Sequence, residues 1–126
     1  MVAPVPARSL TVLVVEDEDG LRLLMRQVLE SAGYQVCEAD EGFQALSILL
    51  QGRPVDLVVS DIRMPRMDGY ELAAHMLALA IKIPILFVSG YVSDLDAPGL
   101  PGQVLPKPFD AEQLLARVRQ LQAVSA

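Results

Sequence analysis

Short apolar segments alternate along this chain with longer segments whose apolar residues recur every three or four positions. The short segments lie at residues 10–15, 34–39, 55–60, 83–88 and 103–105. Their length and composition are typical of strands, whereas the spacing in the longer segments is typical of helices. Strands that alternate with helices favour an α/β fold built on a parallel sheet. This alternation restricts the fold before any single residue is considered.

The longer segments also have the end signals of helices. Helices are expected at residues 21–32, 43–50 and 69–80 and from Asp110 onward. Gly33 follows the first of these and is a natural terminator, because glycine readily takes the backbone conformation that ends a helix. Asp110 is a favourable N-cap, and Gln113 three residues later completes a capping box.

The connection between Ser89 and Lys107 departs from this pattern. It contains several helix breakers, namely Pro98, Gly99, Pro101 and Gly102. At most, residues 92–97 have room for one or two helical turns. The fourth helix is therefore expected to be shortened or irregular.

The chemistry of the strands predicts the order of the sheet. The segments at 10–15, 55–60 and 83–88 are almost wholly apolar, as expected of central strands covered by helices on both faces. The mixed segment at 34–39 and the short one at 103–105 fit the edges. Right-handed crossovers then give the order 2-1-3-4-5, that of a flavodoxin-like three-layer sandwich, with a ligand site at the carboxyl ends of the first and third strands.

Polar residues follow four of the five expected strands. They are Glu16 and Asp17 after the first, Asp61 after the third, Ser89 after the fourth and Lys107 after the fifth. In a parallel sheet these side chains meet at one edge. Carboxylates there suit a hard divalent cation, and the hydroxyl and ammonium groups suit a phosphate.

Size and charge exclude several classes of function. The 126 residues form one domain by size, with a loose lead-in at 1–9 and a tail at 123–126. A formal charge of −6 without basic clusters argues against nucleic acid or an anionic membrane as a partner. The single cysteine, Cys37, fits a cytoplasmic location. Neither a signal peptide nor a membrane-spanning run is apparent in the sequence.

Four motifs resemble the receiver domain of two-component response regulators. They occupy residues 14–17, 60–69, 89–91 and 105–109, each at a strand end and in the family's order. The resemblance covers residues 10–122. It implies a signalling domain that assists its own phosphorylation and dephosphorylation rather than a conventional turnover enzyme.

The resemblance also implies a metal site. Asp17 and Asp61 would supply side-chain oxygens to Mg²⁺ or Mn²⁺, and Arg63 would supply its backbone carbonyl. Glu16 would act through a bound water. Such a mixed oxygen set with retained waters is what Mg²⁺ prefers.

In the same family a phosphoryl group is transferred to an aspartate, which here is Asp61. Lys107 would pair with one phosphate oxygen, and Ser89 would hydrogen-bond to another. The bond between Lys107 and Pro108 is a candidate cis peptide that aims the ammonium into the cleft. The donor would be a histidine kinase or a histidine phosphotransfer protein.

Two departures from the family concern signal output. Val104 occupies a position that often carries an aromatic side chain, and Tyr91 is an alternative contributor. The broken fourth helix alters a face that often contacts partners, so a homodimer is possible but its form is not predicted. The chain is expected to be either a single-domain regulator or a piece of a larger protein, such as a hybrid sensor kinase, with any output domain outside this chain. The Val-Ser-Gly-Tyr segment at 88–91 and Pro-Lys-Pro-Phe at 106–109 resemble receivers of hybrid kinases.

Two alternatives remain open from the sequence. Asp17 to Gly20 resembles the first motif of haloacid-dehalogenase-like phosphatases, although Leu21 and the lack of a cap-sized insertion do not fit. The second alternative is a receiver-shaped binding module that is never phosphorylated. The joint presence of the acids, Ser89 and Lys107 favours the phosphoacceptor over both.

Overall fold

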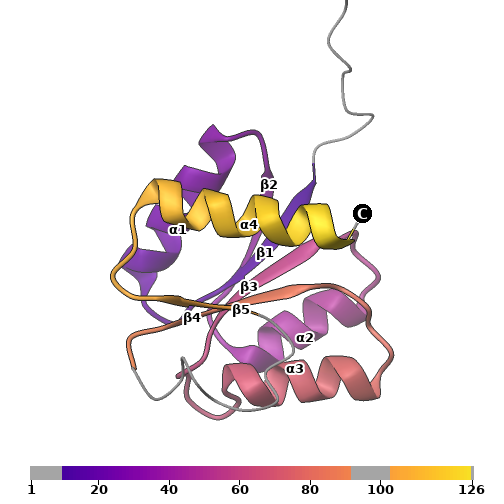
Figure 1. The fold of residues 1–126 in the computed structure, drawn as a ribbon. Coiled ribbons are helices and arrows are strands. Elements are labelled where there is room, and N and C mark those ends of the chain that lie inside the picture. Colours follow the sequence, from indigo (N-terminus) through magenta and orange to yellow (C-terminus); the bar gives the residue numbers. More distant parts are fainter. Residues whose placement is uncertain (1–9, 92–102, 126) are drawn as a thin grey trace, which may run out of the picture.

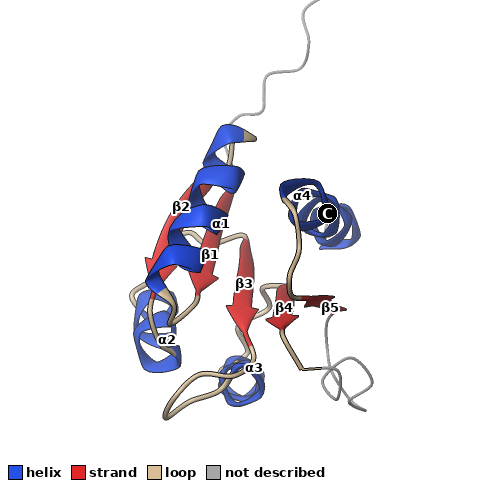
Figure 2. Ribbon diagram, turned by 90° about the vertical axis from the view of Figure 1, so that its left-hand side faces the viewer, coloured by secondary structure: helices blue, strands red, loops and turns tan. Residues whose placement is uncertain are grey.

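A five-stranded parallel sheet lies at the centre of the computed structural model, which describes residues 10–91 and 103–125 (Figure 1). The strands are β1 (Thr11–Val15), β2 (Gln35–Ala39), β3 (Leu57–Asp61), β4 (Ile85–Ser89) and β5 (Gln103–Pro106). Their order is β2-β1-β3-β4-β5, and every neighbouring pair is parallel. The predicted order and the edge positions of the second and fifth strands are confirmed. Figure 2 shows the arrowheads of β1, β3 and β4 pointing towards the same edge.

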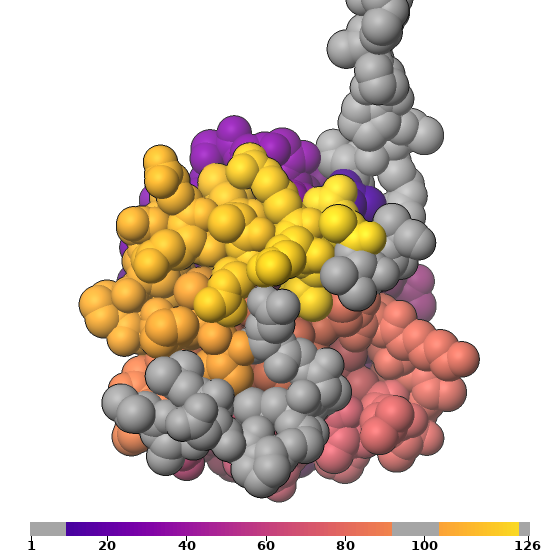
Figure 3. Space-filling view, viewed as in Figure 1, coloured from indigo at the N-terminus to yellow at the C-terminus, as the bar shows by residue number. Residues whose placement is uncertain are grey.

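Helices cover both faces of the sheet. They are α1 (Asp19–Ser31), α2 (Gly42–Leu50), α3 (Gly69–Ala78) and α4 (Ala111–Ser125). Figure 1 shows α1 and α4 above the sheet and α2 and α3 below it. In the space-filling view, α4 forms much of the upper part of the visible face (Figure 3). The predicted three-layer arrangement is confirmed.

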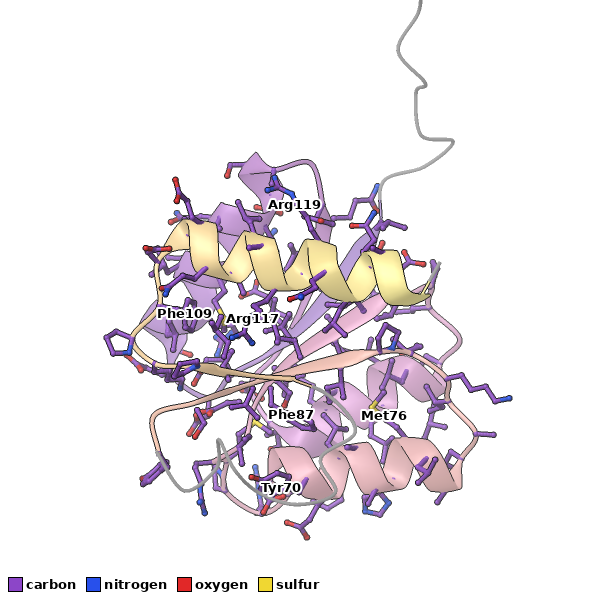
Figure 4. All side chains as sticks on the ribbon, viewed as in Figure 1. Tyr70, Met76, Phe87, Phe109, Arg117 and Arg119 are labelled. Atoms are coloured by element: carbon purple, nitrogen blue, oxygen red, sulfur yellow. The ribbon has the colours of Figure 1, made fainter. Side chains whose placement is uncertain are left out.

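The alternation of side chains along the strands divides the core into two layers. Val12 and Val14 of β1 pack with α1 and α4, while Leu13 and Val15 pack with α2 and α3. Central strands of this kind are apolar on both faces, because each face is covered by helices. Phe87 of β4 belongs to the lower layer, as its position in Figure 4 shows.

Local hydrogen bonds define where the helices begin and end. At the start of α3, Asp68 and Glu71 form a capping box, and Asp110 and Gln113 exchange the same two hydrogen bonds before α4. At the end of α1, the N–H of Tyr34 donates to the carbonyl of Leu29, and the N–H of Gly33, which has a positive φ of 97°, donates to the carbonyl of Glu30. This pair of bonds is the Schellman motif that glycine favours.

Several boundaries differ from those that the sequence predicts. Strand β3 begins at Leu57 rather than at residue 55. Just before it, the carboxylate of Asp56 accepts the N–H of Thr11, and the N–H of Asp56 donates to the carbonyl of Thr11, each at 2.8 Å. Helix α1 begins at Asp19, and α4 continues past residue 122, the expected end of the domain. The expected lead-in at 1–9 and the expected irregular helix at 92–97 lie outside the described residues.

Candidate functional site

The carboxyl ends of four strands place polar side chains along one edge of the sheet. Val15 pairs with Ser60, Asp61 with Val88, and Ser89 with Pro106. This register aligns the strand ends with one another. The structure therefore brings together the side chains that the sequence analysis singles out: Glu16, Asp17, Asp61 and Lys107.

Three carboxylates form a compact acidic cluster at this edge. Each of Glu16, Asp17 and Asp61 offers an oxygen that lies within 4.8 Å of the oxygens of the other two. Glu16 and Asp61 are 1% and 5% exposed, whereas Asp17 is exposed. The cluster therefore has a buried floor and an open, solvent-facing side.

Lys107 projects into this cluster from the segment after β5. Its Nζ lies 3.2 Å from Oε1 of Glu16 and 3.3 Å from Oδ2 of Asp61. The Lys107–Pro108 peptide bond is cis, as the sequence predicts. The backbone N–H of Lys107 donates to the carbonyl of Ser89 at 2.7 Å, which ties the lysine to the end of β4.

Burial, and to a lesser extent neighbouring negative charge, raises the pKa of both buried acids. Burial and then the charge of Asp61 raise the pKa of Glu16 from 4.5 to about 7, against the opposing effects of Lys107 and the Glu18 N–H. Burial also raises the pKa of Asp61, although Lys107 partly opposes it. Burial lowers the pKa of Lys107, but the charges of Asp61 and Glu16 outweigh burial and raise it overall. The single ammonium group of Lys107 therefore does not balance the negative charge of the three carboxylates.

The β3–α3 connection holds the end of β3 by close backbone packing. The N–H of Gly69 donates to the carbonyl of Ile62 at 2.8 Å. A Cβ at residue 69 would lie 2.6 Å from the carbonyl oxygen of Asp61, so a larger residue does not fit there. Asp68 and Gly69 thus shape the loop and are not members of the acidic cluster.

Ser89 and Arg63 lie beside the cluster and share a neighbour in Tyr91. The buried hydroxyl of Ser89 accepts the N–H of Tyr91 at 3.0 Å. The guanidinium of Arg63 lies 4.7 Å from the centre of the Tyr91 ring, within range of a cation–π interaction. The N–H of Arg63 donates to Oδ1 of Asp61 at 3.4 Å.

The Arg63–Tyr91 contact is a feature that the sequence analysis does not identify. The available signal is that both residues lie two positions beyond a polar strand end, after Asp61 and Ser89 respectively. Tyr91 is 56% exposed, whereas Val104, in the position often held by an aromatic, is half-buried against the layer of α2 and α3. A role for Tyr91 in place of that aromatic stays a prediction.

Arg22 is a second residue that the sequence analysis misses. From the second turn of α1 its Nη1 donates to the backbone carbonyl of Glu16 at 2.8 Å. The signal was weak, because an arginine on a helix next to acids is usually a solvated surface residue.

Comparison with known proteins places the chain in one family. A family model described as "Response regulator receiver domain" matches residues 12–119. "Sensor kinase CckA" of Brucella abortus (strain 2308) is 44% identical over 118 residues, which are 90% of this chain and 12% of the kinase. "Response regulator MprA" of Mycobacterium bovis (strain BCG / Pasteur 1173P2) is 40% identical over 119 residues, which are 90% of this chain and 50% of the regulator. The chain thus spans half or less of these curated relatives.

Solved structures of receiver domains are also similar to this chain. The receiver domain of the hybrid histidine kinase CckA has a TM-score of 0.76 and 35% identity, covering 89% of this chain and 98% of that one. A response regulator receiver protein from Sinorhizobium medicae WSM419 has a TM-score of 0.84 and 31% identity, covering 94% and 98%. The similarity to CckA agrees with the resemblance to hybrid kinase receivers.

In residues 10–91 and 103–125, each helix is too short or too polar to cross a bilayer.

The family match favours the receiver domain over the phosphatase that the sequence left open. The predicted fold and family are confirmed, and the chain belongs to the response regulator receiver domains, a family of signalling domains of two-component systems.

Proposed function

We propose that Asp61 accepts a phosphoryl group in a two-component phosphorelay, with Mg²⁺ or Mn²⁺ held by the acidic cluster. The observation that carries the proposal is the cluster itself. Three carboxylates offer oxygens within 4.8 Å of one another, and the Lys107 ammonium lies within 3.3 Å of two of them. The cluster thus offers carboxylate oxygens that can bind a metal ion and, beside them, an ammonium group that can pair with a phosphate.

The donor set fits a hard divalent cation. Carboxylate oxygens are the ligands that Mg²⁺ prefers, and the open side of the cluster leaves room for the waters that Mg²⁺ retains. The raised pKa values of Glu16 and Asp61 indicate that the site lacks positive charge. Asp17 and Asp61 would bind the ion directly, Glu16 through a water, and Arg63 through its carbonyl.

Phosphoryl transfer to Asp61 requires little from the protein beyond position and charge. A carboxylate oxygen of Asp61 forms a bond to phosphorus, and the bond from phosphorus to the donor's imidazole nitrogen breaks, with its electron pair leaving on that nitrogen. The repulsion between the Asp61 carboxylate and the phosphoryl group would be offset by the positive charge of a divalent cation held by the acidic cluster.

Lys107 and Ser89 would receive the new phosphate oxygens. Lys107 already contacts Asp61, so its ammonium can exchange that contact for a phosphate oxygen without moving far. The Ser89 hydroxyl donates to a second oxygen while its own oxygen still accepts from Tyr91. This exchange of partners is the switch that the domain would present to other proteins.

The donor in this proposal is a histidine kinase or a histidine phosphotransfer protein. Support comes from the family and from the similarity to a sensor kinase and to the receiver of a hybrid histidine kinase. An output domain outside this chain and a homodimer belong to the same proposal.

Intact mass spectrometry after incubation with acetyl phosphate and Mg²⁺ tests the assignment. We expect the wild type to gain one phosphoryl group. The adduct should not form when EDTA is added in place of Mg²⁺. Asp61→Asn should gain none. Asp68→Asn is the matched control, because Asp68 is an acid of the same loop that serves as a helix cap, a position that asparagine also suits.

The outcomes separate the rival functions. A full adduct on Asp61→Asn would refute the phosphoacceptor. No adduct on the wild type, with Mg²⁺ bound, would favour a binding module that is never phosphorylated. Steady hydrolysis of a phosphomonoester would favour the phosphatase.

A further inference from the structure

Arg22 reaches back from α1 to the loop that carries two of the three acids. Its Nη1 donates to the carbonyl of Glu16 at 2.8 Å, its Nη2 to Asp19 at 2.7 Å and its Nε to Glu38 at 3.3 Å. The side chain is 18% exposed. All three nitrogens of the guanidinium are therefore engaged, and one of them holds the backbone of a site residue.

We infer that Arg22 is a positioning residue, which fixes the Glu16 backbone so that the carboxylates of Glu16 and Asp17 converge on a divalent cation. This inference rests on the proposed metal site. Residues outside the ligand shell that orient the ligands typically change metal affinity 10- to 100-fold when they are replaced.

The other bonds of the loop show why such a contact matters. The N–H of Glu16 donates to the carbonyl of Ala39 at 3.1 Å, and its carboxylate accepts the N–H of Glu18 at 3.1 Å. The bond from Arg22 fixes the remaining polar group of Glu16, its carbonyl. The peptide that joins Glu16 to Asp17 is thereby held in one orientation.

The start of α1, like that of α2, lacks the side-chain cap that α3 and α4 have. Helices α3 and α4 begin with capping boxes, at Asp68 and Asp110. The N-cap of α1, Glu18, makes no side-chain capping hydrogen bond within the described part of the chain. Arg22 therefore contributes order to this loop that a capping side chain supplies elsewhere.

Charge alone predicts the opposite effect on metal binding. A guanidinium beside a cation site repels the cation, so its removal by itself would strengthen Mg²⁺ binding. Loss of positioning would weaken it. The sign of the change in affinity therefore distinguishes the two effects.

Arg26 provides a matched control on the same helix. It pairs with Glu38, as Arg22 does, and with Glu30. Arg26→Gln thus removes one positive charge and one contact to Glu38 while leaving the bond to the Glu16 carbonyl in place.

The test is isothermal titration of Mg²⁺ into the metal-free wild type, Arg22→Gln, Arg22→Lys and Arg26→Gln. We expect Arg22→Gln to bind about 10-fold more weakly than the wild type, and Arg26→Gln to stay within about 2-fold. Arg22→Lys keeps the charge but loses the planar fork, so it should fall between them. In the metal-free proteins, the amides of Glu16 and Glu18 should exchange faster with solvent in the Arg22 variants only.

Each result is decisive. If Arg22→Gln binds Mg²⁺ as tightly as Arg26→Gln, and its loop amides exchange at the wild-type rate, the inference is wrong while the metal site stands. If Arg22→Gln does not fold, Arg22→Lys with wild-type affinity overturns the inference in the same way. If the wild type itself binds no Mg²⁺, the proposed site fails and the inference with it.

Discussion

Glu16 is a buried acid whose ionisation its surroundings oppose. Because its pKa is raised from 4.5 to about 7, the native state holds a proton that the unfolded chain releases between these values. The free energy of unfolding of the metal-free protein should therefore fall as pH rises through this window. At about 1.4 kcal/mol per pKa unit, the fall from Glu16 is on the order of 3–4 kcal/mol at most. Urea denaturation across the window measures it.

Glu16→Gln is the variant that isolates this effect. The amide keeps an oxygen for the Glu18 N–H but carries no charge. The slope of stability against pH should become shallower, with a remainder from Asp61, whose pKa is also raised. An unchanged slope in Glu16→Gln would mean that the wild-type glutamate titrates normally.

The positions of the acids and of Lys107 could be predicted from the sequence, whereas the contacts of the arginines could not. A residue at the end of a buried strand has its place fixed by the register of the sheet. Arg22 and Arg63 have long side chains with many rotamers, and the sequence does not say which one is adopted. Their bonds to the Glu16 carbonyl and the Tyr91 ring emerge only from the packed structure.

The junction between β3 and α3 depends on the absence of a side chain at Gly69. A Cβ there would lie 2.6 Å from the Asp61 carbonyl oxygen and 2.9 Å from the Ile62 Cα, and both atoms belong to the backbone. Gly69→Ala should lower the free energy of unfolding by about 1–3 kcal/mol. It should also slow phosphorylation by acetyl phosphate, because the end of β3 must move.

Gly20→Ala is the corresponding control at the start of α1. A Cβ at Gly20 would meet no atom of the described residues within 4 Å. Alanine is favoured over glycine inside a helix by up to about 1 kcal/mol, so this variant should be at least as stable as the wild type. Equal stability of Gly69→Ala and the wild type in chemical denaturation would contradict the steric argument.

Strands and helices were predictable to different degrees. The apolar runs locate all five strands, since helices on both faces demand apolar residues in both directions. The first residue of each strand is harder to predict from the sequence. Asp56 lies within an apolar segment, but it precedes β3 and its side chain accepts a hydrogen bond from the Thr11 N–H. Helix α1 starts at Asp19, earlier than its first apolar residue, because acids in a first turn are favoured by the helix dipole.

Metal binding should stabilise the whole domain, because the unfolded chain does not hold the three carboxylates together. At a Mg²⁺ concentration about 100 times the dissociation constant, the gain is about 2.7 kcal/mol. We expect the thermal midpoint to rise with Mg²⁺ and to return after addition of EDTA. Asp17→Asn should lose most of this rise, since Asp17 is the exposed carboxylate of the cluster.

Asp40→Asn is a suitable control for that measurement. Asp40 is also an exposed acid after a strand, but it lies outside the acidic cluster. It should keep the full response to Mg²⁺. An equal loss in both variants would point to general screening of negative charge rather than to a site.

The pairing of β4 with β5 fixes Ser89 and Lys107 by neighbouring hydrogen bonds, and the lysine N–H binds the serine carbonyl directly. The long stretch between the two strands therefore does not have to place either group. A substitution elsewhere that leaves this backbone pair intact should therefore leave the spacing between Ser89 and Lys107 unchanged.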